Sequence, residues 1–172
     1  LAIEKIPGIA QSGVVLSRVL KGKELDVATP DTVLHLGDII HAVGSIEKLK
    51  DVQIIIGKPS DVDLKSMPSS VTTRRVVVTK KGVLGKTIEE LDLDAYGVAV
   101  TRVSRAEIEF TPSPSVRLQF ADTLLLVGEA DAIADSEPIG TMLLAEGKVR
   151  NISDQAKDAP YSLEYCCAVI LN

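Results

Sequence analysis

The side chains best suited to bind an anion are two pairs of basic residues that recur 84 positions apart. Arg18 and Lys21 belong to the segment GVVLSRVLKG, and Arg102 and Arg105 belong to the segment GVAVTRVSRA. A guanidinium can receive a carboxylate or phosphate, and it can equally cover apolar surface with its stem and pair with a buried carboxylate. All four residues are therefore candidate ligand-binding residues, with a structural role as the alternative.

A second candidate for chemistry is the segment GVLGKT at residues 82–87. It ends like a phosphate-binding loop, but that motif needs a glycine at the position of Lys80. A glycine turn in front of a capped helix accounts for the same residues. A nucleotide-handling enzyme acting through Gly85, Lys86 and Thr87 is thus a weak alternative, and since no other catalytic motif is present we predict a protein without enzymatic activity.

The histidines and cysteines do not form a recognisable metal site. His35 and His41 lie on adjacent predicted strands, but their counterparts 84 residues later are Gln119 and Leu125, so a repeated metal site is not expected. Cys166 and Cys167 are neighbours, which disfavours a disulfide between them and indicates reduced thiols. We predict no metal and no cofactor.

The elements that must position the basic residues are themselves duplicated. Residues 13–49 align without a gap to residues 97–133, with nine identities in 37 positions. An ungapped match of this length indicates two copies of one small module. In each copy the turn sequences LGD and FAD place Asp38 and Asp122 where their carboxylates can cap backbone amides or pair with an arginine.

Hydrophobic patterning predicts the elements of each copy. Thr87 and Glu90 form a capping box that predicts a short helix, and Ser45 is a suitable N-cap for a helix over residues 46–50. The remaining pattern predicts strands at residues 13–20, 32–36, 39–43, 74–79, 97–104, 107–111, 116–120 and 123–127, and a helix at residues 129–135.

These elements predict an α+β fold of two tandem modules, each a small, mostly antiparallel sheet with short helices. The first module is expected at residues 1–57, with its front truncated, and a linker rich in Ser and Pro at 58–71. The second module is expected at 72–140. Residues 141–172 match nothing in the first copy and form a tail whose structure the sequence does not predict.

Composition narrows the possible functions. The net charge is −5 and only 3% of residues are aromatic, whereas nucleic-acid binders usually carry a basic field and aromatic platforms. We therefore exclude nucleic acid as a partner. No apolar run approaches the length of a spanning helix, and no secretory signal is visible, so the chain as given is expected to be soluble.

The assembled motifs resemble a known family. The pattern GKTIEELDL, YGVAVTRVSR and PSPSVRLQFADTLLLVG closely resembles the TrkA C-terminal domain, also called the C-terminal domain of regulators of potassium conductance, and the first copy resembles it too. The tandem is similar to the cytosolic insert of the aspartate–alanine exchanger family of bacterial transporters. Ala121 departs from the family's usual glycine, and Ala106-Glu107 replaces a usual Ala-Gly.

The resemblance implies a function in regulation. It implies a dimerising, ligand-sensing module of an ion or amino-acid exchanger, at the cytoplasmic face of the membrane, with itself and the transmembrane part of the transporter as partners. The ligand implied is a small anionic solute or a nucleotide, received by Arg102 and Arg105 or by Arg18 and Lys21 in the other copy. The alternative is a dimerisation platform without a ligand.

Overall fold

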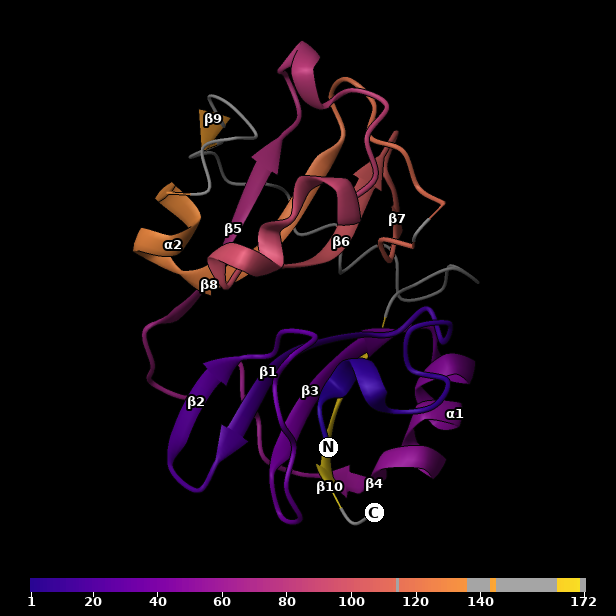
Figure 1. Ribbon diagram of the computed structural model, residues 1–172, viewed down its shortest axis with the longest axis vertical. Helices are drawn as coiled ribbons and strands as arrows, with labels where there is room; N and C mark the ends of the chain where they lie inside the picture. The colour runs from indigo at the N-terminus through magenta and orange to yellow at the C-terminus, as the bar shows by residue number, and fades with distance from the viewer. Residues whose placement is uncertain (114, 136–142, 145–163, 171–172) are drawn as a thin grey trace.

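The computed structural model describes residues 1–113, 115–135, 143–144 and 164–170, and it contains two five-stranded antiparallel sheets stacked in one molecule (Figure 1). Sheet one has the strand order β2-β1-β3-β10-β4, and sheet two has the order β7-β6-β8-β5-β9. Sheet one comprises β1 (Val15–Lys21), β2 (Glu24–Val27), β3 (Ile39–Gly44), β4 (Gly57–Ser60) and β10 (Glu164–Ile170). Sheet two comprises β5 (Val71–Val77), β6 (Ala99–Arg105), β7 (Ile108–Phe110), β8 (Thr123–Glu129) and β9 (Leu143–Leu144).

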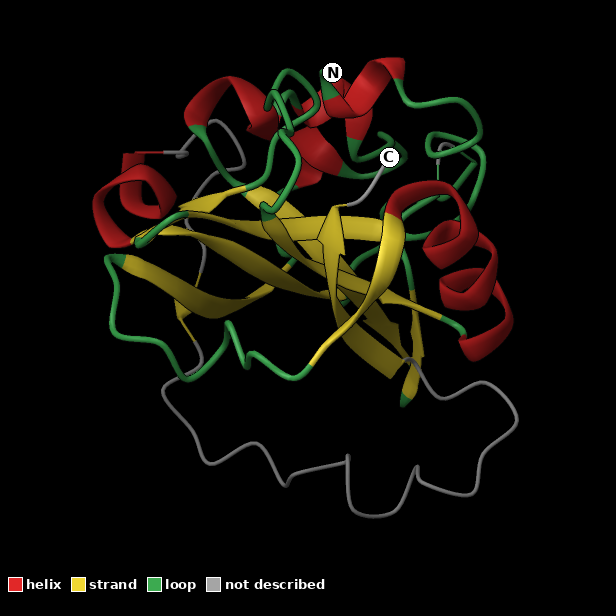
Figure 2. Cartoon of the chain, turned by 90° about the horizontal axis from the view of Figure 1, so that it is seen from below, coloured by secondary structure: helices red, strands yellow, loops and turns green. Residues whose placement is uncertain are grey.

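Short helices complete each sheet. The α-helices are α1 (Ile46–Ile56) beside sheet one and α2 (Ala130–Asp135) beside sheet two. The 3-10 helices are η1 (Ile3–Lys5), η2 (Lys81–Val83), η3 (Glu89–Leu91) and η4 (Leu93–Tyr96). Figure 2 shows the helices gathered around one side and the ends of the strands. The predicted α+β class, with two small antiparallel sheets and short helices, is confirmed.

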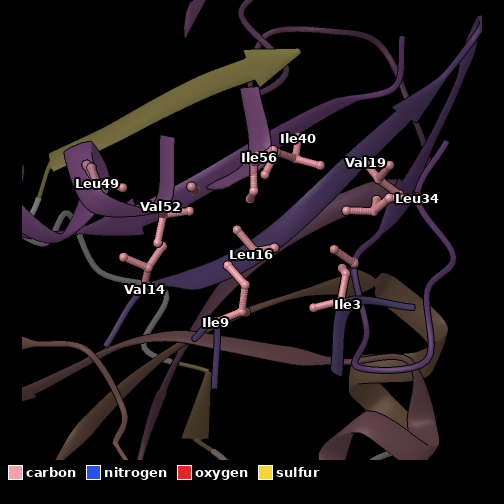
Figure 3. Packing of buried hydrophobic residues seen from close by; sticks show 12 residues of the cluster. Ile3, Ile9, Val14, Leu16, Val19, Leu34, Ile40, Leu49, Val52 and Ile56 are labelled. Atoms are coloured by element: carbon pink, nitrogen blue, oxygen red, sulfur yellow. The ribbon is translucent and has the colours of Figure 1, made fainter. Parts of the chain in front are cut away.

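The apolar residues of each copy build a separate core. In sheet one, Leu49, Val52 and Ile56 project from α1 onto β1 and β3, where Figure 3 shows them facing Val14, Leu16 and Ile40. In sheet two, the corresponding cluster is built around five side chains that are fully buried: Val76, Val98, Val103, Leu124 and Leu126. Because aromatic residues are scarce, mainly aliphatic side chains from strands, short helices and loops fill each core.

Two helix-start predictions are confirmed by their hydrogen bonds. The amide of Thr87 donates to Glu90 Oε2 at 2.7 Å, and the amide of Glu90 donates to Thr87 Oγ1 at 3.3 Å, which completes the capping box. The backbone hydrogen bond from Thr87 lowers the pKa of Glu90. Ser45 Oγ accepts from the amide of Lys48 at 3.5 Å, and the helix it caps continues to Ile56 rather than ending at residue 50.

The strands predicted at residues 32–36 and 116–120 are wrong. Each segment makes only an isolated bridge, Val33 to Ala2 and Arg117 to Thr87, instead of a ladder. Their sequences alternate because Leu34 and Leu118 insert into the core from a loop while the adjacent side chains are more exposed. Periodicity alone could not distinguish such a loop from a strand.

Two stretches that the sequence left without regular structure contribute strands to the sheets. The expected linker includes most of β4, and within it Leu64 is fully buried against Leu20 and Leu25. The expected tail includes β9 and β10, and β10 pairs with β3 on one side and β4 on the other. The remainder of that tail lies outside the described residues, and the proposed domain boundaries stay predictions.

The two sheets contact each other through equivalent strands. β1 lies against β6, and β2 lies against β5 and β8. A hydrogen bond from Thr111 Oγ1 to the carbonyl oxygen of Gly13, at 2.9 Å, also joins the two halves. Since β1 and β6 carry the duplicated basic residues, this interface brings the repeats together.

Candidate functional site

A cavity of about 340 Å³ lies between the two sheets and is lined by basic side chains, and we call it the cationic cavity. Both modules contribute equivalent positions to it: Arg18 and Arg102, Ser17 and Thr101, and His41 and Leu125 are pairs separated by 84 residues. The complete lining is Ser17, Arg18, His41, Val43, Lys65, Thr73, Arg75, Thr101, Arg102, Leu125 and Val127. None of these described lining residues carries a carboxylate, so the cavity favours an anion.

A β-bulge in each module aims the two arginines into this cavity. The pairing of β1 with β3 shifts register between Leu16 and Arg18, and the pairing of β6 with β8 shifts between Val100 and Arg102. Simple alternation would place Arg18 on the same face as Leu16, which is buried in the core. One extra residue at the bulge turns the following side chain to the opposite face.

The two arginines differ in their neighbours. Arg18 is 6% exposed, and its Nη2 donates to Thr73 Oγ1 across the interface at 2.9 Å. Arg102 Nη1 donates to Glu109 Oε2 on β7 at 2.9 Å, and this ion pair is partly exposed. Arg18 thus links the modules directly, while Arg102 approaches the cavity from an edge hairpin.

His41 forms the buried wall of the cationic cavity. The side chain is 3% exposed, and its Nδ1 lies 2.8 Å from Ser17 Oγ. Burial first, and then the positive charges of Arg18 and Lys65, lower the pKa of His41 to about 4. The imidazole is therefore neutral at pH 7, and the net positive character of the cavity comes from its arginines and lysine.

The other two predicted binding residues lie elsewhere. Arg105 Nε and Nη2 each donate to the Asp122 carboxylate at 2.8 Å, a bidentate pair in which Asp122 is 1% exposed. These hydrogen bonds raise the pKa of Arg105. Lys21 ends β1 opposite Glu24, and neither Lys21 nor Arg105 lines the cationic cavity. In this structure the geometry of Arg105 fits the structural alternative.

Of the eleven lining residues, sequence reasoning predicted only Arg18 and Arg102 as binding residues, and three of those it missed lie outside the strands that carry these arginines and their central neighbours. Thr73 and Arg75 come from β5, and Lys65 comes from the segment that was expected to be a linker. The sequence shows Arg74 and Arg75 side by side in the predicted RRVVVT strand. Only the stacking of the two sheets shows that Arg75, and not Arg74, lines the cavity. Lys65 carried no periodic signal.

A second cavity between the modules, of about 350 Å³, is mainly apolar. Its lining includes residues 14–16 and 98–100, at and just before the starts of β1 and β6, so both strands contribute to both cavities. Asp94 is among its lining residues, and partial burial and then the charges of Asp92 and Asp31 raise the pKa of Asp94. Any change in the spacing of β1 and β6 alters both cavities together.

The glycine turn at residues 82–87 does not present a phosphate cradle. The amide of Gly85 donates to the carbonyl oxygen of Leu118 at 2.8 Å, and the amide of Lys86 donates to Val83 at 3.2 Å. The amide of Thr87 is used by Glu90. Because these amides already have protein acceptors, the turn is explained by its place in the fold.

Two kinds of feature are absent from the described part of the chain. Among those residues, no group of three or more His, Cys, Asp or Glu side chains is arranged to hold a metal ion. No helix in the same residues has the length and hydrophobicity needed to cross a membrane.

Comparison with known proteins identifies the second module. Residues 73–138 match the TrkA-C domain. A protein of Yersinia pseudotuberculosis serotype O:3, named "Putative transport protein", is 42% identical over 134 residues, which is 77% of this chain and 24% of that protein. A protein of Aeromonas hydrophila with the same name is 40% identical over the same shares of both chains. The chain therefore contains a TrkA-C domain and is homologous to about a quarter of the length of these transport proteins.

Proposed function

We propose that this chain is the regulatory, ligand-sensing part of a membrane transporter of the ion or amino-acid exchanger type, and that it has no catalytic role. The relatives carry the name "Putative transport protein". The tandem motifs in the sequence resemble the cytosolic insert of the aspartate–alanine exchangers. The transmembrane part of the same transporter would be its partner, at the cytoplasmic face of the cell membrane. Self-association into a homodimer belongs to the same proposal.

The observation that carries this proposal is the cationic cavity shared by equivalent strands of both modules. A small anion bound there would contact Arg18 from one module and Arg102 from the other. Binding would then favour the arrangement in which the two guanidinium groups converge, because a ligand shifts an equilibrium only through its different affinity for the two states. Ligand binding would thus change how the two modules are positioned relative to each other, and this change could be transmitted to an attached transporter.

The test is ligand binding to the intact chain. Sulfate, L-aspartate, AMP and a cyclic dinucleotide are the probes, and binding is measured by thermal shift and calorimetry. A probe present at 100 times its Kd should stabilise the fold by about 2.7 kcal/mol. Arg18→Ala and Arg102→Ala should each weaken binding about tenfold or more, since each removes a charge-assisted hydrogen bond.

Arg74→Ala is the matched control. Arg74 lies on β5 next to Arg75, is exposed, and donates to Thr72 rather than lining the cavity. Binding that is equally weakened by Arg74→Ala would indicate a general charge effect and contradict the assignment of the site. Stabilisation by none of the probes would favour the alternative of a platform without a ligand.

That alternative has its own supporting observation. Leu36 and Phe120 occupy equivalent turn positions in the two modules and are 74% and 67% exposed. A large apolar side chain kept at the same exposed position in both copies fits a surface for self-association. Sedimentation velocity of the chain and of a Leu36→Ser, Phe120→Ser double variant tests it, and the platform requires a dimer that the double variant dissociates.

A further inference from the structure

The fourth strand of sheet one is β10, which comes from the C-terminal part of the chain. By the 84-residue repeat, β1 corresponds to β6 and β3 corresponds to β8. The two strand orders then place β10 where sheet two has β5, each antiparallel to the central strand beside it. Yet β5 precedes all other strands of its module, whereas β10 follows every other strand in the molecule.

The two sides of this position hold β10 unequally. Toward β3, residues Glu164–Val169 pair in continuous register with Gly44–Ile39. Toward β4, only Cys167–Ile170 pair with the strand Gly57–Ser60, which contains Pro59. Proline has no amide hydrogen to donate to a ladder, so the pairing of β10 with the edge strand β4 is the weaker of its two pairings.

Release of β10 would leave β2, β1 and β3 paired and would remove the strand partner of β4, which stays in contact with α1. The pairings of β1 with β2 and with β3 do not involve β10. The described pairing of β9 is with β5 in sheet two, so release of β10 breaks none of the described strand pairs of sheet two. The edge of β3 would then present unpaired amides and carbonyls, which are a template for an added strand.

We propose that the groove between β3 and β4 is a strand-acceptor site, and that Glu164–Ile170 is a displaceable occupant of it. The partner that fits is an extended peptide segment that pairs antiparallel with β3. Sheet two shows that the same module can take its strand from the segment in front of it, and sheet one shows that a segment from elsewhere fills the same position. The site therefore recognises mainly backbone geometry.

The test uses the full chain with Ala168→Pro, which removes an amide from the middle of β10, and Ala168→Gly as a control that keeps the amide. Hydrogen exchange is followed in β3 and, as an internal reference, in β8. Ala168→Pro should raise exchange in β3 about tenfold or more while β8 stays protected. Ala168→Gly should change β3 much less.

A peptide with the sequence of residues 164–170, flanked by lysines for solubility and kept reduced, is then added to the Ala168→Pro chain. It should restore protection of β3, while the same peptide with proline in place of its alanine should not. Protection of β3 that is unchanged by Ala168→Pro, or lost and not restored by excess peptide, overturns the proposal.

A second measurement covers the case in which Ala168→Pro does not fold. The labelled peptide is incubated with the unaltered chain, and fluorescence anisotropy follows its incorporation. Slow incorporation accompanied by loss of the chain's own β10 protection supports a displaceable strand. A complete lack of incorporation over the time in which β10 amides exchange contradicts it.

Discussion

Burial of a neutral His41 should make the stability of this protein depend on pH in a defined window. The pKa of His41 is lowered from 6.5 to about 4 in the folded state. The unfolded chain therefore binds a proton below pH about 6.5 that the folded chain does not accept until pH about 4. The contribution of the neutral imidazole is complete above pH 6.5 and is lost as the pH falls toward 4.

The magnitude follows from the size of the shift. One pKa unit corresponds to about 1.4 kcal/mol, so a shift from 6.5 to about 4 is equivalent to about 3 kcal/mol across the whole window. At pH 5 about 2 kcal/mol should already be lost. This is a large fraction of the stability of a typical small domain.

The assay is urea unfolding of the unaltered chain and of His41→Gln between pH 7 and pH 4.5. Glutamine does not titrate, and its amide can still meet the Ser17 hydroxyl that lies 2.8 Å from Nδ1. Because carboxylates titrate in both chains, the difference between the two curves isolates the histidine. We expect His41→Gln to lose about 2 kcal/mol less than the unaltered chain between pH 7 and pH 5.

His35→Gln is the control, because the His35 side chain is 69% exposed in a turn. This variant keeps His41 in place, so the loss of about 2 kcal/mol expected from His41 between pH 7 and pH 5 should remain. Parallel curves for the unaltered chain and His41→Gln would refute the argument that burial between the arginines keeps His41 neutral.

Three further predictions concern urea unfolding at pH 7. Ala121 has a φ of 68°, and Gly37 has a φ of 89° at the equivalent position of the other module. Ala121→Gly should therefore stabilise the fold and Gly37→Ala should destabilise it, each by about 1 kcal/mol. Effects of the opposite sign would contradict the inference that Ala121 is strained. Asp122→Ala should cost about 2–4 kcal/mol, because it removes the bidentate acceptor of Arg105 and the acceptor of the Gln119 amide, while Asp38→Ala should cost about 1–2 kcal/mol for one lost backbone hydrogen bond. Leu64→Ala should cost about 2–5 kcal/mol, which a true linker residue would not.

Much of each module could be predicted from local sequence. The duplication, the buried strands near Val103 and Leu124, and the capping box at Thr87 are consequences of periodicity and side-chain chemistry over a few residues. The positive φ at Ala121 also follows from its alignment with a glycine. The prediction failed for the loops that contain Leu34 and Leu118. A loop that buries one leucine between exposed neighbours shows the same short alternation of apolar and polar residues as a half-buried strand.

The candidate site could be predicted only in part. Arg18 and Arg102 were identified because both copies keep them, and the structure places both at one cavity. The bulges that aim them and the partners of Arg105 depend on register, which a single sequence does not display. Lys65 came from a stretch without any pattern, because a cavity between two sheets is lined by whatever residues happen to face it.

The sequence by itself determined that one strand-rich module occurs twice, since apolar spacing, caps and turn residues act between near neighbours in the chain. The tertiary structure alone decided that β1 faces β6 and that β10 completes sheet one. Those arrangements depend on contacts between segments separated by tens to more than one hundred residues, such as β3 and β10. The pairing of such strands depends on how their residues pack against neighbours from distant parts of the chain, so it is selected by the free energy of the whole fold rather than by any local pattern.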